Sequence, residues 1–200
     1  PDRDGLFADL VGALALAGGN VVGAQVFTTA GGRAFDVFYV QEQGGRPFGW
    51  SDPGARDRLK TAVERAAIEG LDPAQMIPNR PVKRREAAFR VSPFVNIDGE
   101  ASDAALVIEA SGRDRPRLLH DLASALTEMG LSLAAARIDG YGERAVDVFY
   151  VTEAGAKPSE PERIDAIRKR LLAVLDAPEG ALEDARAETG LAQAVANEGR

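Results

Sequence analysis

In the second half of the chain, segments whose apolar residues have helical spacing alternate with short strand-like segments. Between residues 118 and 129 they fall three or four positions apart, which predicts a helix that ends at Gly130. A second helical pattern covers about 160–176. Short runs rich in Val, Ala, Phe and Tyr predict strands at about 104–110, 131–139 and 144–153. The predicted order is therefore strand, helix, strand, strand, helix.

The first part of the chain shows a similar pattern. It predicts a helix at about 4–17, strands at about 20–29 and 34–42, and a helix at about 53–69. The proline-containing stretch 71–87, with its basic run Lys83-Arg84-Arg85, is typical of a solvated linker. A strand is predicted at 88–97. It either pairs with 104–110 in a hairpin or closes the first half, and the sequence leaves both arrangements open.

The two halves repeat one sequence. With an offset of 112, the residues Asp2, Arg3, Leu6, Asp9, Leu10, Ala13, Leu14, Gly18 and Ala24 recur as Asp114, Arg115, Leu118, Asp121, Leu122, Ala125, Leu126, Gly130 and Ala136. With an offset of 111, Asp36-Val37-Phe38-Tyr39-Val40 recurs as Asp147-Val148-Phe149-Tyr150-Val151. A repeat of this kind predicts two copies of one domain.

The predicted fold class is α+β, with two ferredoxin-like βαββαβ units in tandem. Copy one covers residues 1–87, with the linker from about 71, and copy two covers 88–177 with its preceding strand. Residues 178–200, rich in Ala, Glu and Gly, are expected to form a flexible tail. A strand-like run precedes Asp114 but nothing precedes Pro1, so we expect copy one to lack its first strand and the chain to be a fragment.

Composition narrows the classes of function. The net charge of −7 argues against a nucleic-acid surface, which needs basic side chains. There are no cysteines, which excludes disulfides and thiolate metal sites and suits a reducing compartment. No apolar run is long enough to span a membrane. The single histidine, His120, has no metal-ligand spacing around it and is expected to be a partly exposed helix residue.

The Asp-Arg pair before the first helix of each copy is the strongest candidate for chemistry. Free backbone N–H groups and the helix dipole at such a turn suit a carboxylate. Asp2 or Asp114 could then receive an ammonium group, so that the turn would recognise an α-amino acid. The competing interpretation is a plain helix cap, with Asp114 as the N-cap and Pro116 in the first turn, which leaves the arginine unexplained.

Four other recurring carboxylates have structural explanations. Asp9 and Asp121 lie in the first turns of their helices, where a carboxylate favours the dipole. Asp36 and Asp147 interrupt apolar strands and are expected to face solvent or a sheet edge.

These motifs resemble the ACT domain, a βαββαβ module that senses amino acids. In copy two the resemblance rests on Asp114-Arg115-Pro116, on Gly130-Leu131-Ser132-Leu133 and on Gly142-Glu143-Arg144-Ala145-Val146-Asp147. In copy one it rests on Asp2-Arg3-x-Gly5-Leu6-Phe7, Asn20-Val21-Val22 and the Asp36 strand. Arg117 departs from the usual glycine, which stands at Gly5 in copy one. The pair is also similar to the C-terminal region of the bacterial bifunctional uridylyltransferases and uridylyl-removing enzymes, over about residues 1–176.

That resemblance implies a regulatory region, with glutamine as the expected ligand. The parent enzymes modify the PII signal protein of nitrogen metabolism in the cytoplasm, and their magnesium-dependent catalysis resides in other domains. No catalytic, metal or cofactor site is therefore expected in this chain. Implied ligand-binding residues are Asp2, Arg3, Gly5, Leu6, Asn20, Asp114, Arg115, Pro116, Leu118 and Ser132.

ACT pairing is expected within or between chains. Two alternatives stay open: a two-ACT transcriptional regulator, and an ACT pairing module that binds no ligand.

Overall fold

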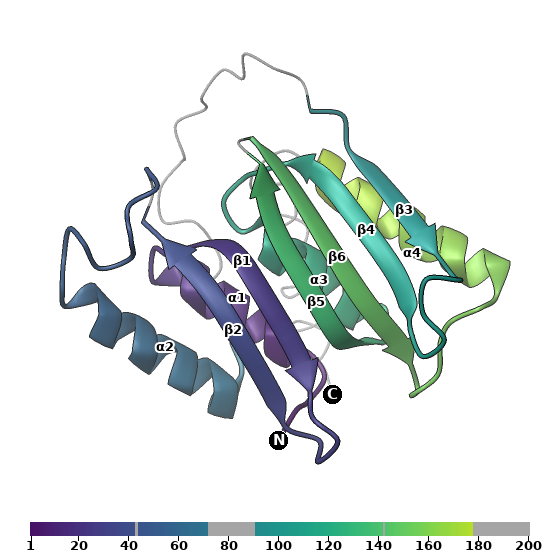
Figure 1. The fold of residues 1–200 in the computed structure, drawn as a ribbon, viewed down its shortest axis with the longest axis horizontal. Helices are drawn as coiled ribbons and strands as arrows, with labels where there is room; N and C mark the ends of the chain where they lie inside the picture. Colours follow the sequence, from purple (N-terminus) through teal and green to yellow (C-terminus); the bar gives the residue numbers. More distant parts are fainter. Residues whose placement is uncertain (43, 72–90, 142, 178–200) are drawn as a thin grey trace, which may run out of the picture.

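In the computed structural model, four helices pack on one face of a single antiparallel sheet (Figure 1). The structure describes residues 1–42, 44–71, 91–141 and 143–177. The predicted linker between about 71 and 87 falls almost wholly outside these ranges, as does the predicted tail at 178–200. The α+β class predicted from the sequence is confirmed.

The helices and strands follow the predicted order with shifts of a few residues at their ends. The helices are α1 (Leu6–Leu16), α2 (Ala55–Glu69), α3 (Leu118–Glu128) and α4 (Pro161–Asp176). The strands are β1 (Asn20–Thr28), β2 (Ala34–Gln41), β3 (Phe94–Asp98), β4 (Leu106–Arg113), β5 (Leu131–Tyr141) and β6 (Arg144–Glu153).

The two copies share one sheet because β1 of copy one pairs with β5 of copy two. The strand order is β2-β1-β5-β6-β4-β3. Gln25 lies opposite Arg137, its own counterpart in the repeat, and the pairs Ala24–Ile138 and Val26–Ala136 lie symmetrically on either side. The copies are therefore related by an approximate two-fold axis through the Gln25–Arg137 pair, as in an isologous dimer.

The strand that precedes copy two closes that copy and not copy one. β3 pairs antiparallel with β4, from Phe94–Ser111 to Asp98–Val107. This settles the choice left open by the sequence in favour of the hairpin. The prediction that the strand runs from 88 to 97 was wrong at its start, since residues 91–93 are not in a strand and residues 88–90 lie outside the described part.

The helices α1 and α3 pack against each other under the β1–β5 junction. His120 lies there, only 7% exposed, and its Nδ1 is 2.9 Å from the carbonyl oxygen of Ala8, the counterpart of His120 in copy one. A side chain at Gly12 would collide with the imidazole ring and with Leu71. The expectation of a partly exposed histidine was wrong, because the packing of the two copies buries this helix face.

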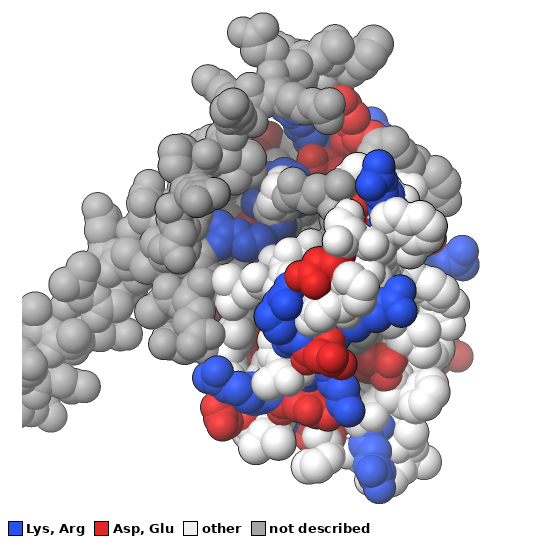
Figure 2. Space-filling model, turned by 90° about the vertical axis from the view of Figure 1, so that its left-hand side faces the viewer, with Lys and Arg blue, Asp and Glu red and all other residues white. Residues whose placement is uncertain are grey.

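The outer helix of copy one is much more exposed than its counterpart in copy two. Only Ala66 of α2 is buried, whereas α4 buries Ile167, Leu171 and Val174. Figure 2 shows the side of the molecule on which α2 and β2 lie, where basic and acidic side chains alternate. The ion pairs of this region are Arg58–Asp52, Lys60–Glu64 and Arg65–Glu69.

Candidate functional site

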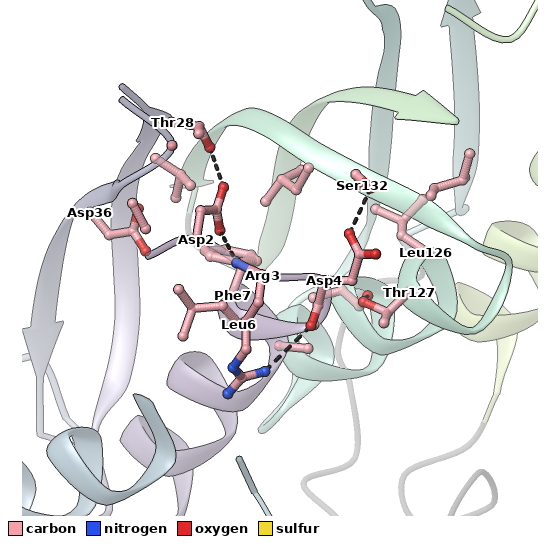
Figure 3. Close-up of a pocket in the computed structure, with 18 residues that line it drawn as sticks. Asp2, Arg3, Asp4, Leu6, Phe7, Thr28, Asp36, Leu126, Thr127 and Ser132 are labelled. Carbon is pink, nitrogen blue, oxygen red and sulfur yellow. Dashed lines mark hydrogen bonds between the residues drawn. The ribbon is translucent and has the colours of Figure 1, made fainter. Parts of the chain in front are cut away.

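A cavity of about 230 Å³ lies between the start of α1 and the strands that flank it (Figure 3). Copy one contributes the turn from Asp2 to Ala8 and residues of β1 and β2, while copy two contributes residues of α3 and β5. Its lining residues are Asp2, Arg3, Asp4, Gly5, Leu6, Phe7, Ala8, Val26, Thr28, Gly32, Ala34, Asp36, Ala123, Leu126, Thr127, Leu131, Ser132 and Leu133. The cavity therefore exists only because the two copies pack together.

The turn before each first helix has the same backbone shape in both copies. Gly5 has φ 77° and Arg117 has φ 65°, both left-handed, and the helix begins at the next residue without a side-chain cap. Asp114 is therefore not the N-cap of α3, and Pro116 precedes the helix, so the capping interpretation was wrong. The uncapped N-terminal N–H groups of α1 lie at the cavity and suit an anion.

The recurring arginine has a structural role in each copy. Arg3 pairs with Asp9 at 2.6 Å and donates to the carbonyl oxygen of Ala66 on α2 at 3.0 Å. Arg115 pairs with Asp121 at 2.6 Å and donates to the carbonyl of Val174 on α4 at 3.3 Å. Each arginine thus ties the turn, its own helix and the second helix of its copy together. This explains why Arg and the later Asp recur at the same spacing.

The carboxylates of Asp2 and Asp4 line the cavity and point in different directions. Asp2 accepts a hydrogen bond from the hydroxyl of Thr28 on β1 and a second from the backbone N–H of Arg3. Asp4 turns the other way and accepts a bond of 2.7 Å from the hydroxyl of Ser132 on β5. Figure 3 shows these two carboxylates reaching to opposite walls, one in each copy. Asp4–Ser132 is therefore a polar bridge between the copies.

Asp36 projects from β2 beside Asp2 and lines the same cavity. Its Oδ1 is buried and has no hydrogen-bond partner among the described residues. Burial and, next, the nearby charge of Asp2 raise the pKa of Asp36 to about 6, and the backbone N–H of Phe27 opposes both effects. Asp36 lies on the edge strand β2, in line with the prediction of a sheet-edge position, but it is half-buried and faces the cavity.

Comparisons with known proteins match the whole chain to one kind of enzyme. A bifunctional uridylyltransferase/uridylyl-removing enzyme of Caulobacter vibrioides is 50% identical over 201 residues, which cover 100% of this chain and 21% of that enzyme. The enzyme of the same description from Phenylobacterium zucineum is 47% identical over the same length, and that of Azospirillum brasilense is 43% identical over 88% of the chain. This chain belongs to the bifunctional uridylyltransferase/uridylyl-removing enzyme family.

The chain spans about a fifth of the length of these relatives, 21% of the Caulobacter enzyme. No family model matches it, and no solved structure gives a significant match. The recognition of this enzyme family from the repeated motifs is confirmed by the relatives.

Some of the predicted ligand-binding residues line the cavity, and the others do not. Asp2, Arg3, Gly5, Leu6 and Ser132 line it together. The remaining predicted residues, Asn20, Asp114, Arg115, Pro116 and Leu118, are not among its lining residues. Asn20 lies exposed at the start of β1, opposite Gln41.

The counterpart of Asp36 in copy two is enclosed. Asp147 is 2% exposed, and burial, followed by the charges of Asp114 and Asp139, raises its pKa to about 8. Burial also raises the pKa of Asp114. The solvent-facing prediction was wrong for Asp147, because β6 is covered by β4 on its outer edge and by helices on one face.

Sequence reasoning missed Asp4, Thr28 and Asp36 as parts of the site. The recurrence of Asp36 as Asp147 was visible, but an acid in an apolar strand gave no sign of which face it occupies. Asp4 and Thr28 are not repeated, since Pro116 and Gly140 stand at the corresponding positions. Because neither residue recurs, the repeat carries no signal for them.

Within the described ranges, no group of three or more His, Asp or Glu side chains is placed to hold a metal ion. In the same part of the chain, no helix has the length and apolarity needed to cross a membrane.

Proposed function

We propose that this chain is the amino-acid-sensing region of an enzyme that attaches uridylyl groups to the PII nitrogen signal protein and removes them. Glutamine is the proposed ligand, and the two copies act as a tandem ACT pair in a cytoplasmic enzyme. Magnesium belongs to the catalysis of that parent enzyme. The observation that carries the proposal is the cavity formed by both copies at the start of α1.

The chemistry of the cavity supports an α-amino acid as ligand. The uncapped start of α1 offers backbone N–H groups and the positive end of a helix dipole to a carboxylate. Asp2, from the turn before α1, and Asp36, from β2, line the same cavity and suit an ammonium group. Apolar side chains of both copies, including Phe7, Leu126 and Leu133, line the remaining wall. A volume of about 230 Å³ suits a small metabolite and is below the range of drug-sized sites.

Regulation follows from the position of the cavity between the copies. A ligand there contacts the turn of copy one and β5 of copy two at once, so it stabilises the arrangement in which both walls are in place. A ligand shifts a conformational equilibrium only through its different affinities for the two states. In the proposed enzyme, glutamine would favour the state that removes uridylyl groups over the state that adds them.

The proposal is tested by titrating the chain with glutamine in a calorimeter, with glutamate, glycine and branched-chain amino acids as controls. Saturable binding of glutamine alone, lost in Asp2→Ala and retained in Asp114→Ala, is the expected result. The two variants are a matched pair, because the residues are counterparts in the repeat. Absence of binding by any amino acid in a folded chain would overturn the proposal and favour a pairing module.

A second assay tests the link to the enzyme. In a full-length relative, glutamine is expected to suppress uridylylation of PII, and the change that corresponds to Asp2→Ala is expected to abolish this response while leaving the rate without glutamine unchanged. A full glutamine response in that variant would mean that glutamine is sensed at a site other than this cavity.

A further inference from the structure

We propose that Asp36 is the carboxylate that receives the ammonium group of the ligand, and that this contact makes binding release a proton from the chain. The inference rests on the proposed function, since it concerns the same cavity. It concerns which carboxylate recognises the ligand and how the affinity for the ligand depends on pH.

Among the carboxylates of the cavity, Asp36 is the one with an unused buried acceptor. Asp2 already accepts bonds from Thr28 and from the backbone of Arg3, and Asp4 accepts one from Ser132. Oδ1 of Asp36 is buried without a partner among the described residues. A buried acceptor without a partner is costly, and a donor on a ligand removes that cost.

The charges around Asp36 favour a cation and not an anion as its partner. From the turn before α1, Asp2 and Asp4 face the same cavity, and both are acidic. Among the described residues that line the cavity, Arg3 is the one basic residue, and its guanidinium is paired with Asp9 and bonded to the carbonyl oxygen of Ala66. β1 faces Asp36 with Val26 and Thr28, and copy two contributes Thr127 and Ser132, none of which carries a charge. An ammonium group at Asp36 therefore finds a second carboxylate, Asp2, beside it.

The proton balance follows from the state of Asp36 before binding. Because the pKa of Asp36 is raised to about 6, part of the unliganded chain holds a proton on this carboxyl near that pH. An ammonium group stabilises the ionised carboxylate, so the proton passes from Asp36 to the buffer and the ligand keeps its own charge. Linkage then predicts that affinity is nearly constant above about pH 7 and falls roughly tenfold between pH 7 and pH 5.

The test is calorimetry with glutamine near pH 6 and near pH 8, each in two buffers with different heats of ionisation. The expected result is net release of roughly half a proton near pH 6 and none near pH 8. Asp36→Asn is expected to bind roughly 10- to 100-fold more weakly, with no buffer-dependent heat. Asp147→Asn, the matched change in copy two, is expected to keep both the affinity and the proton release.

Three outcomes would overturn the inference while leaving the proposed function intact: tight binding by Asp36→Asn, no release of protons near pH 6, or proton uptake, which would put a ligand carboxylate at Asp36. Failure of the unaltered chain to bind any amino acid would overturn both. If Asp36→Asn does not fold, the carboxyl carbon of Asp36 can be titrated by NMR in the unaltered chain. Its midpoint is expected to fall when glutamine is added, and an unchanged midpoint would contradict the inference.

Discussion

The two copies share a sequence pattern and a backbone, but the aspartate of their repeated strand has different surroundings in each. In copy two, β4 pairs with the outer edge of β6 and β3 pairs with β4. Asp147 of copy two is enclosed, whereas Asp36 of copy one is half-buried and lines the cavity. The repeated residues thus maintain the fold, and the differences around them create the candidate site.

The largest expected difference between the copies concerns the repeated arginine. Arg115 and Asp121 are nearly buried, with side chains 13% and 9% exposed, whereas the side chain of Arg3 is 37% exposed. Arg115→Met leaves a buried carboxylate without its partner and is expected to lower the free energy of unfolding by about 3–5 kcal/mol. Arg3→Met is expected to cost about 1 kcal/mol or less. Urea denaturation measures both, and equal losses would contradict the proposed difference in burial.

The second helices of the two copies, α2 and α4, differ in how deeply their leucines are buried. Leu171 of α4 is fully buried, whereas Leu59 of α2 is half-buried. Leu171→Ala is expected to lower the free energy of unfolding by about 2–5 kcal/mol, and Leu59→Ala by less than half as much. If the two changes proved equally costly in denaturant unfolding, α2 would have to be packed as tightly as α4.

Asp147 and Asp36, whose pKa values are both raised, predict different effects of pH on stability. The folded chain keeps a proton on Asp147 up to about pH 8, while the unfolded chain loses it near its ordinary pKa of 3.8. The free energy of unfolding therefore falls as the pH rises between these values, by up to about 1.4 kcal/mol per pH unit for one proton. Asp36 contributes in the same direction only up to about pH 6.

Asp147→Asn keeps a neutral side chain at every pH, so it is expected to flatten the decline between about pH 6 and pH 8 and to raise stability there. Asp36→Asn is expected to leave that interval unchanged. Urea midpoints measured across the interval check both statements. A decline that persists in Asp147→Asn would mean that another group titrates.

The smallest expected effect concerns the polar bridge between the copies. Ser132→Ala removes the hydrogen bond to Asp4 and is expected to cost about 0.5–1.5 kcal/mol. Asn20→Ala, at the matching position of copy one, is exposed and is expected to change stability by less than about 0.5 kcal/mol. A larger loss for Asn20→Ala than for Ser132→Ala would contradict the assignment of the bridge.

The fold was predictable because its signals are local. Helical spacing, turn glycines and the repeated Asp36-Val37-Phe38-Tyr39-Val40 strand placed most elements to within a few residues. The site was only partly predictable, because it joins segments far apart in the chain. Asp4 and Ser132 are 128 residues apart in sequence, and only the β1–β5 pairing brings them together. The burial of His120 and Asp147 follows equally from packing between elements.

The central claim is that an amino acid binds between the copies, at the turn of copy one. The most direct measurement follows the backbone amide resonances of the isotope-labelled chain while glutamine is added. We expect saturable shifts that cluster at Asp2 to Leu6, at Asp36 and at Ser132, with little change between Asp114 and Leu118. Shifts confined to the Asp114 turn, or none at saturating glutamine, would contradict the claim.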